Sequence, residues 1–156
     1  METKREEAAI KLVVKSADDV TMLSAFLQDG LIAAPDIHFD KARAEVVMVV
    51  DRYRWEDSAE RKERVLMGLR IGKVTACLQK KMQAQAAPQA APLFYNLLQL
   101  SYEKELDGQM SLLFTFSAGA ALRLMIDDLM MSAGDIAPPR PAIAQPSHDR
   151  PESSGK

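Results

Sequence analysis

Hydrophobic and polar residues alternate near the start of the chain and then change to a helical period. Ile10, Leu12 and Val14 occupy alternate positions, which predicts a short strand. Ser16 and the acids that follow it are typical of a helix start, because a hydroxyl and carboxylates satisfy the free amides of the first turn. The apolar stripe that follows consists of Val20, Leu23, Leu27 and Leu31. The pattern predicts a helix at residues 17–29, with Gly30 as its C-cap.

The apolar positions between residues 45 and 78 predict a long β-hairpin around a charged loop at 56–63. If the strands pair with Arg54 opposite Arg64, the odd positions form one apolar face. These positions are Val47, Val49, Tyr53 and Trp55 in the first strand and Val65, Met67, Leu69 and Ile71 in the second. Past Gly72 the apolar parity flips, which predicts a β-bulge that curls the sheet.

Alternation returns in the second half of the chain. It predicts strands at 94–102 and 110–116, joined by a turn at Asp107 and Gly108, and a last strand at 122–126. Ile126, Leu129 and Met130 then change to helical spacing, which predicts a short C-terminal helix that ends near Gly134.

Three segments have compositions that do not support a packed structure. Residues 1–8 are expected to be a flexible N-terminus, and the Ala/Gln/Pro-rich residues 83–92 a flexible linker. The proline-rich residues 137–156 are expected to be a disordered tail. Residues 9–136 are therefore expected to form one α+β domain. We predict a curled, mostly antiparallel sheet of about six to seven strands, packed by one main helix (17–29) and a short C-terminal helix.

Composition narrows the function classes. The 156 residues carry a formal net charge of −2, which disfavours a general nucleic-acid binder. A single cysteine fits a reducing compartment. The charged N-terminus lacks the apolar core of a signal peptide, and no apolar run is long enough to span a bilayer. We therefore expect a cytoplasmic protein without a membrane partner.

No catalytic, cofactor-binding or metal-binding pattern is found. The glycines lack the spacing of a phosphate-binding loop. With two histidines and one cysteine, a transition-metal site would have to consist mainly of carboxylates. A Cys77–His38 nucleophile pair requires that the fold bring the two together, and an inert thiol in a strand is the simpler interpretation. We expect no catalytic residues, no metal and no cofactor.

Four arginines form the one candidate binding surface, namely Arg52, Arg54, Arg64 and Arg70. In the predicted register all four point away from the apolar face, and Arg54 lies across from Arg64. Either nearby acids relieve this repulsion or an anionic partner does, since guanidinium groups suit phosphate and carboxylate. The candidate acids are Glu56, Asp57, Glu60 and Glu63. Trp55 is assigned to the core, and it joins the candidate site if the sheet curls so that it reaches the rim.

Three segments resemble a small alphaproteobacterial family catalogued as a domain of unknown function, family 2948. They are DDVTMLSAFLQDG at 18–30, VVDRYRWE at 49–56 and AGAALRL at 118–124. The family shows an Asn-Arg-Phe-Arg-Trp-Glu strand end, from which Asp51 and Tyr53 depart, and a small residue such as Ala where Gly30 stands. The resemblance spans residues 9–136. It implies a bacterial, cytoplasmic, single-domain protein and carries no activity, cofactor or site residue.

Three functions remain, and they are given in the order in which the sequence favours them. The first is a non-enzymatic binding or regulatory module that uses its sheet face or edge. The second is a small anionic-ligand binder or enzyme that uses the same arginines. The third is RNA binding, which would weaken steeply with salt. The expected partner is an unknown protein or a small anionic ligand, and a sheet with free edges can also pair with its own copy.

Overall fold

The computed structural model describes residues 9–56, 62–82 and 93–142. In these ranges eleven strands form one sheet in which the neighbouring strands are antiparallel. The elements are β1 (Lys11–Val14), α1 (Ala17–Leu27), β2 (Leu31–Ala33), η2 (Ala34–Asp36), β3 (Ile37–Asp40), β4 (Glu45–Tyr53), β5 (Glu63–Ile71), β6 (Val74–Lys80), β7 (Phe94–Lys104), β8 (Met110–Phe116), η3 (Ser117–Gly119), β9 (Ala121–Ile126), β10 (Met131–Asp135) and β11 (Arg140–Pro141).

The prediction of six to seven strands and two helices is wrong. Strand β2 begins at Leu31, which the helical stripe had included. Strand β10 replaces the expected C-terminal helix, because Met131 and Ala133 are buried while Ser132 between them is exposed. This strand lies between β5 and β1 and satisfies the backbone groups of both. The spacing of nearby residues does not show that a strand is needed between β1 and β5, which are far apart in the sequence.

The sequence predicts the position of helix α1 correctly. The side-chain oxygen of Ser16 accepts a hydrogen bond from the Asp19 amide at 3.2 Å, as expected of an N-cap. The helix ends at Leu27 with Gln28 as its C-cap, so the prediction of Gly30 as the C-cap is wrong, and Asp29 adopts the left-handed conformation (φ 64°). Gly30 is instead required for close packing, because a Cβ there would lie 2.5 Å from Cγ1 of Val50.

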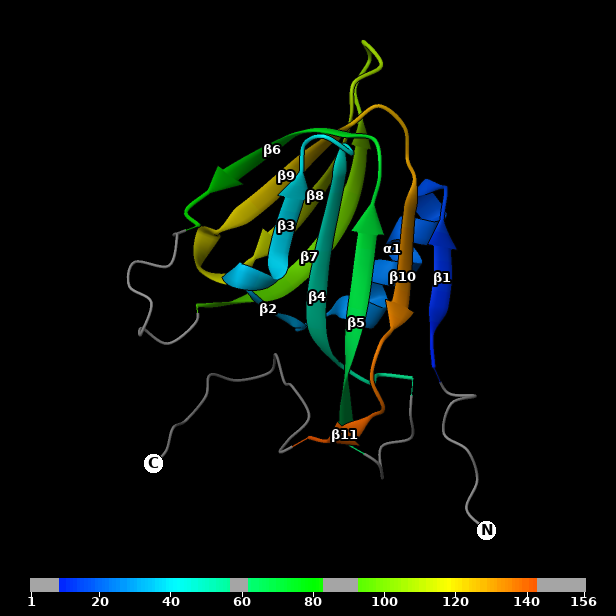
Figure 1. Cartoon of the computed structure of the whole chain (residues 1–156), viewed down its shortest axis with the longest axis vertical. Coiled ribbons are helices and arrows are strands. Elements are labelled where there is room, and N and C mark those ends of the chain that lie inside the picture. Colours follow the sequence, from blue (N-terminus) through cyan, green and yellow to red (C-terminus); the bar gives the residue numbers. More distant parts are fainter. Residues whose placement is uncertain (1–8, 57–61, 83–92, 143–156) are drawn as a thin grey trace.

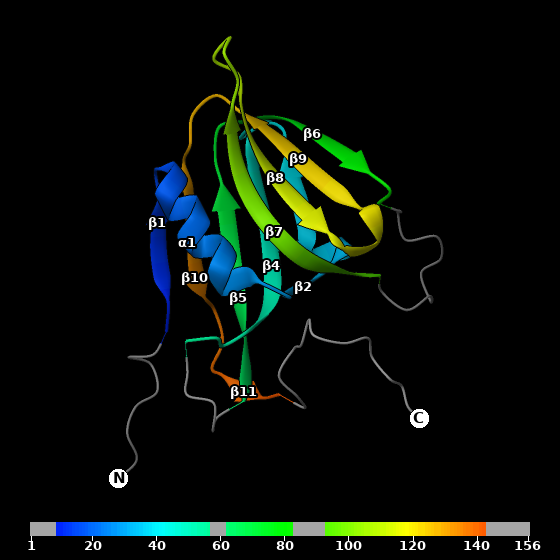
Figure 2. The same ribbon diagram turned by 180° about the vertical axis from the view of Figure 1, so that it is seen from behind.

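The sheet folds back on itself into two layers (Figures 1 and 2). One layer contains β1, β10, β5 and β4, and the other contains β7, β8, β9 and β6. Strand β2 pairs with both β4 and β7 and so connects the layers on one side. Elsewhere the chain passes directly from β5 to β6, and the Val74 amide bonds to the carbonyl of Ala44 at 2.8 Å. Helix α1 covers the side between β1 and β7 (Figure 2).

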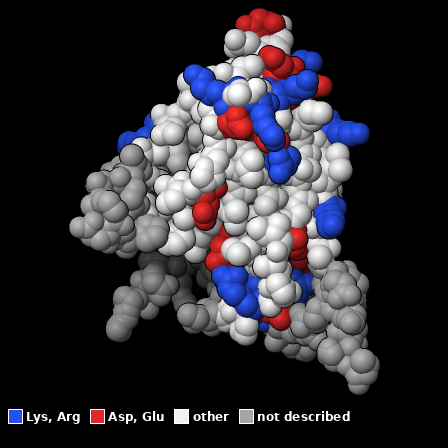
Figure 3. Space-filling model, in the orientation of Figure 1, with Lys and Arg blue, Asp and Glu red and all other residues white. Residues whose placement is uncertain are grey.

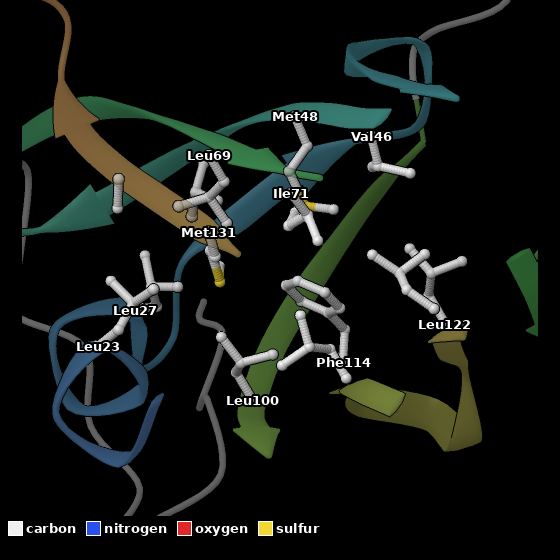
Figure 4. Close-up of a cluster of buried hydrophobic side chains, with 14 of the residues drawn as sticks. Leu23, Leu27, Val46, Met48, Leu69, Ile71, Leu100, Phe114, Leu122 and Met131 are labelled. Atoms are coloured by element: carbon white, nitrogen blue, oxygen red, sulfur yellow. The ribbon is translucent and has the colours of Figure 1, made fainter. Parts of the chain in front are cut away.

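The core lies between the two layers and the helix (Figure 4). Leu23 and Leu27 enter it from α1, and Phe114 lies opposite Ile71. All of these side chains are 0% exposed, so water is excluded from the junction of helix and sheet. Burial of this apolar surface supplies the main force that keeps the sheet curled.

The register of the β4–β5 hairpin differs by one residue from the prediction. Arg64 pairs with Tyr53, not with Arg54. Because side chains alternate along a strand, the shift moves the even-numbered residues of β4 to the core. These residues are Val46, Met48, Val50 and Arg52, and each is 0% exposed. The run from Val46 to Val50 is apolar at every position, so its parity could not be read from the sequence alone.

The turn between β7 and β8 is confirmed, with Gly108 at a φ of 93°. The phase change after Gly72 is a corner between β5 and β6, and β6 has its own register shift between Val74 and Ala76. Residues 1–8, 83–92 and 143–156 lie outside the described residues. In the segment expected to be a disordered tail, Arg140–Pro141 pairs with β5 as β11.

Candidate functional site

Arg52 lies on the core face of β4 and is fully buried. Its guanidinium group donates two hydrogen bonds to Asp135, from Nε to Oδ1 at 3.1 Å and from Nη2 to Oδ2 at 2.9 Å. It also donates Nη1 to Oε1 and Nη2 to Oε2 of Glu56, at 2.9 and 2.8 Å. Two bidentate carboxylates therefore enclose the planar fork, an arrangement that arginine satisfies and lysine does not. The ring of Phe26 lies 5.8 Å from the guanidinium carbon.

Asp135 connects this pair to the N-terminal edge of the sheet. Its Oδ2 also accepts a hydrogen bond from the Ile10 amide at 2.9 Å, and its side chain is 4% exposed. Ile10 precedes β1 and Asp135 ends β10, so one carboxylate joins both strands to β4. Asp135 was not predicted as a site residue, because it follows the stretch whose spacing predicts a C-terminal helix. The partner of Asp135 is not evident in the sequence, because it depends on the pairing of β10 with β5.

Arg54 extends the network to the start of β5. Its side chain is 4% exposed, and its Nη1 lies 2.6 Å from Oε1 of Glu63. Its Nε lies 3.4 Å from Oε2 of Glu56. Glu56 and Glu63 are two of the four acids that the sequence offered as partners, and the other two lie outside the described residues. Arg52 and Arg54 thus have acidic partners within the chain and little contact with solvent.

Arg64 and Arg70 lie on the opposite, outer face of β5. The Nε of Arg64 donates to Oδ1 of Asp51 at 3.1 Å, and its Nη2 donates to the Asp51 carbonyl at 2.7 Å. The Nη1 of Arg70 lies 2.8 Å from Oε2 of Glu45, and the Arg70 side chain is 58% exposed. The four predicted arginines therefore divide between two faces and do not form one patch.

Trp55 is half-buried and connects the hairpin to the helix. Its Nε1 donates to the carbonyl of Gln28, the C-cap residue of α1, at 2.9 Å. Its ring also packs edge-on against Tyr53, with centroids 4.8 Å apart. Tyr53 is buried at 3% exposure. The two aromatic residues hold the end of β4 against the end of α1.

The protonation of Glu56 is coupled to this network. Burial by itself would raise the pKa of Glu56, but the hydrogen bonds and positive charge of Arg52, with a contribution from Arg54, lower that pKa below its ordinary value. A group with a lowered folded-state pKa stabilises the protein above its unfolded-state pKa, and that stabilisation is lost as the pH falls.

We expect Glu56→Gln to lower the free energy of unfolding at pH 7 by about 1–3 kcal/mol, because a charge-assisted pair is lost. The difference from wild type should shrink as the pH falls below the ordinary carboxyl pKa of 4.5, because Glu56 is protonated first in the unfolded chain and at lower pH in the folded protein too. Urea unfolding of both proteins between pH 3 and pH 7 measures this. A difference that stays constant over that range would contradict the role of Glu56.

The outer face of the β1–β10–β5–β4 layer carries valine, isoleucine and glycine residues between Arg64 and Arg70, with Lys11 at their β1 end. Directly across the four strands, Val13, Ser132, Arg70 and Val47 form one row. The next row is Lys11, Gly134, Gly68 and Val49. We call the following residues the outer band: Val13, Val47, Val49, Gly68, Gly134 and Ile136.

The outer band forms a shallow groove of about 600 Å³. Gly68 and Gly134 are direct partners in neighbouring strands and line the groove, and the side chain of Ile136 lies over Gly68, where a Cβ would be 3.4 Å from its Cγ2. Val13 and Ile136 are 66% and 59% exposed at its sides. Figure 3 shows uncharged surface between two groups of charged side chains on this face, the lower of them near β11. Arg64, Asp51 and Arg140 form a charged cluster where β11 pairs with β5.

Comparison with known proteins identifies a family. The family described as "Protein of unknown function (DUF2948)" matches residues 10–148. The chain belongs to this family. The DUF2948 description assigns no activity, so membership leaves the function unknown. No curated protein matches the chain, and no solved structure matches it.

Two further findings concern the described residues. None of their helices is long and apolar enough to cross a membrane. Among them, no group of three or more His, Cys, Asp or Glu side chains is arranged to hold a metal ion.

Proposed function

We propose that this DUF2948 protein is a non-enzymatic binding module that contacts a protein partner through the outer band. The observation that carries the proposal is a groove lined by exposed Val13 and Ile136 and by half-buried valine and glycine residues, with charged side chains around it. Protein interfaces have this composition, with an apolar centre and a polar rim. Isolated exposed hydrophobic residues are ordinary, but several that line one groove support an interaction site.

Arg64 and Arg70 form the rim of the proposed contact, on the same face of β5 as Gly68. Their charges would steer the partner and define its orientation more than they would add affinity. Arg52, Arg54 and Trp55 support the site from the other face by holding the end of the hairpin. An anionic ligand at Arg52 would have to displace two bidentate carboxylates, so the geometry favours a protein partner over a small anion.

A cytoplasmic location and a bacterial source are part of the proposal. The single cysteine supports the first, since cytoplasmic thiols stay reduced. The family resemblance supports the second.

The test introduces lysine at two exposed positions of the outer band, in the double variant Val13→Lys/Ile136→Lys. A desolvated lysine in the centre of an interface opposes binding. We expect capture of the specific partner from nuclease-treated extract of the source cells to fall at least about tenfold, which corresponds to about 1.4 kcal/mol. Quantitative mass spectrometry of the captured proteins measures this.

The matched control is Leu78→Lys, which alters an equally exposed leucine (53%) on β6, away from the outer band. It should capture the same partner as wild type. Arg70→Ala should mainly reduce the association rate and its dependence on salt. Equal capture by wild type and the Val13→Lys/Ile136→Lys variant would rule out the outer band as the binding site.

A further inference from the structure

Strand β7 has a long edge that no described strand covers. On one side β7 pairs with β8 from Leu97 to Lys104. On the other side it pairs with β2 at Phe94, Tyr95 and Asn96, and the Leu97 amide and carbonyl bond to Gly30 and Asp29. Beyond Leu97 this second edge faces helix α1, to which β7 packs. A sheet edge of this kind presents main-chain donors and acceptors that can pair with another chain.

The direction of each main-chain group along this edge follows from three hydrogen bonds. The Leu97 amide bonds to the carbonyl of Gly30 at 2.8 Å, away from β8. A register shift between Leu97 and Gln99 then changes the parity. After it, the Leu100 amide bonds to Oγ of Ser24 at 3.0 Å, again away from β8, and the Glu105 amide bonds back to the carbonyl of Gln109. Even-numbered residues therefore direct their amide and carbonyl groups outward.

The hydroxyl of Ser24 takes the place of a carbonyl that a neighbouring strand would offer at this edge. It accepts the Leu100 amide, and the next outward groups are the Leu100 carbonyl, both main-chain groups of Tyr102 and the Lys104 amide. Donors and acceptors thus recur at the spacing of a strand. Only the main chain of another extended segment reproduces that repeat, which is the basis of recognition by strand addition.

A groove of about 590 Å³ lies between α1 and this edge. The helix contributes Thr21, Ser24 and Ala25 to it, and the strand contributes Gln99, Ser101 and Tyr102. No charged side chain lines the groove. Its volume falls in the range of ordinary ligand sites. Small and hydroxyl-bearing walls leave room beside the strand for the main chain and small side chains of a guest.

Edge strand β1 differs in the features that discourage pairing. It is four residues long, and Lys11 and Lys15 are exposed at its ends. Short length and lysine protect an edge against added strands. Strand β7 is eleven residues long and carries no charge from Phe94 to Tyr102, and its two charged residues, Glu103 and Lys104, stand at its end. Helix α1 covers the β7 edge at Leu100, but the groove leaves room beside Tyr102, so this part of the edge can accept a strand, while β1 is protected along its length.

We propose that β7 and α1 form a second binding site, which accepts an extended, uncharged peptide segment of another protein as an added strand. The segment pairs with the Leu100 carbonyl and with both main-chain groups of Tyr102, and it places small or β-branched side chains against Thr21 and Ala25. This site shares no residue with the outer band, so it does not depend on the function proposed above.

The experiment selects binders to the full chain from a displayed library of random twelve-residue peptides. We expect enriched sequences that are uncharged and rich in small and β-branched residues at alternate positions. Two signatures identify strand addition. A selected peptide that is N-methylated at alternate amides should bind at least about tenfold more weakly, because its main-chain donors are removed. Hydrogen exchange at the amides of Tyr102 and Lys104 should slow at least about tenfold when the unmodified peptide is bound.

The site is tested with Ala25→Arg, which fills the groove from an exposed helix position with a residue of good helix propensity. It should weaken peptide binding at least about tenfold. The matched control, Met22→Arg, changes an exposed residue of the same helix that does not line the groove, and it should bind as wild type does.

Several results would overturn the proposal. They are the absence of any enriched peptide, binding that tolerates N-methylation or Ala25→Arg, and binding that is lost in the Val13→Lys/Ile136→Lys variant alone. Concentration-dependent protection of the Tyr102 amide in the free chain would assign the edge to a second copy, and would equally overturn it.

Discussion

Replacing Arg52 with alanine is expected to lower the free energy of unfolding by about 3–5 kcal/mol. The variant leaves Asp135, whose side chain is 4% exposed, without its two hydrogen bonds from the guanidinium group. It also removes both contacts to the Glu56 carboxylate, at 2.9 and 2.8 Å, and leaves a cavity below Phe26. Urea unfolding followed by far-ultraviolet circular dichroism measures the change.

Two variants distinguish the effect of losing the buried network from the effect of losing any arginine. Arg70→Ala removes an ion pair whose arginine is 58% exposed, and it should cost less than about 1 kcal/mol. Arg52→Lys keeps a positive charge but cannot serve two carboxylates with a planar fork, so its loss should lie between those of the two alanine variants. A loss below about 1 kcal/mol for Arg52→Ala would show that the guanidinium group is not enclosed by acids.

The network also explains where the sequence misleads. Arginine and glutamate beside a charged loop look like a solvent-exposed surface, and the predicted register placed Arg52 there. The structure turns Arg52 inward because a shift of one residue reverses every side chain of β4. Two facts that decide this are remote in the sequence, namely the Asp135 partner and strand β10 that carries it. Neither has a local signal.

Features that depend on nearby residues could be predicted. The N-cap at Ser16, the helix behind it and the turn at Gly108 are encoded within a few residues, and the structure has each of them. Strand β2 could not be predicted in this way, because Leu31 continues the helical stripe and pairs with Asp51 and Asn96 only in the folded chain. The outer band was also hidden, since Val13, Gly68 and Ile136 come together only across strands from both ends of the chain.

The edge of β7 shows the same division. Its alternation and its uncharged composition are visible in the sequence, and the strand at 94–102 was predicted. Its unpaired state is not visible, because it depends on how far β2 extends and on where α1 packs. A free strand edge or a groove lined by glycine is formed by the absence of a partner. Such a site can be recognised only when the topology of the sheet is known.

The curled architecture depends on Phe114, and Phe114→Ala is expected to lower the free energy of unfolding by about 3–5 kcal/mol. The residue is 0% exposed on β8, between its strand partners Leu100 and Leu122. Figure 4 shows its ring directed from that layer toward Ile71 of the opposite layer. Loss of the ring removes contacts between the layers as well as within one of them, and the curled sheet cannot collapse without strain at its corners. Urea unfolding at pH 7 measures the change.

Leu113→Ala provides the matched control, because Leu113 is the preceding residue of β8 and points to the outer face. A half-buried leucine on that face should cost about 1 kcal/mol, since less apolar surface returns to water and no closed cavity forms. The two variants differ by one position on the same strand, so β-propensity and strand pairing are nearly matched. Equal losses would mean that β8 does not face the β4–β5 hairpin. A larger loss at Phe114 would show that the two layers of the sheet enclose one core.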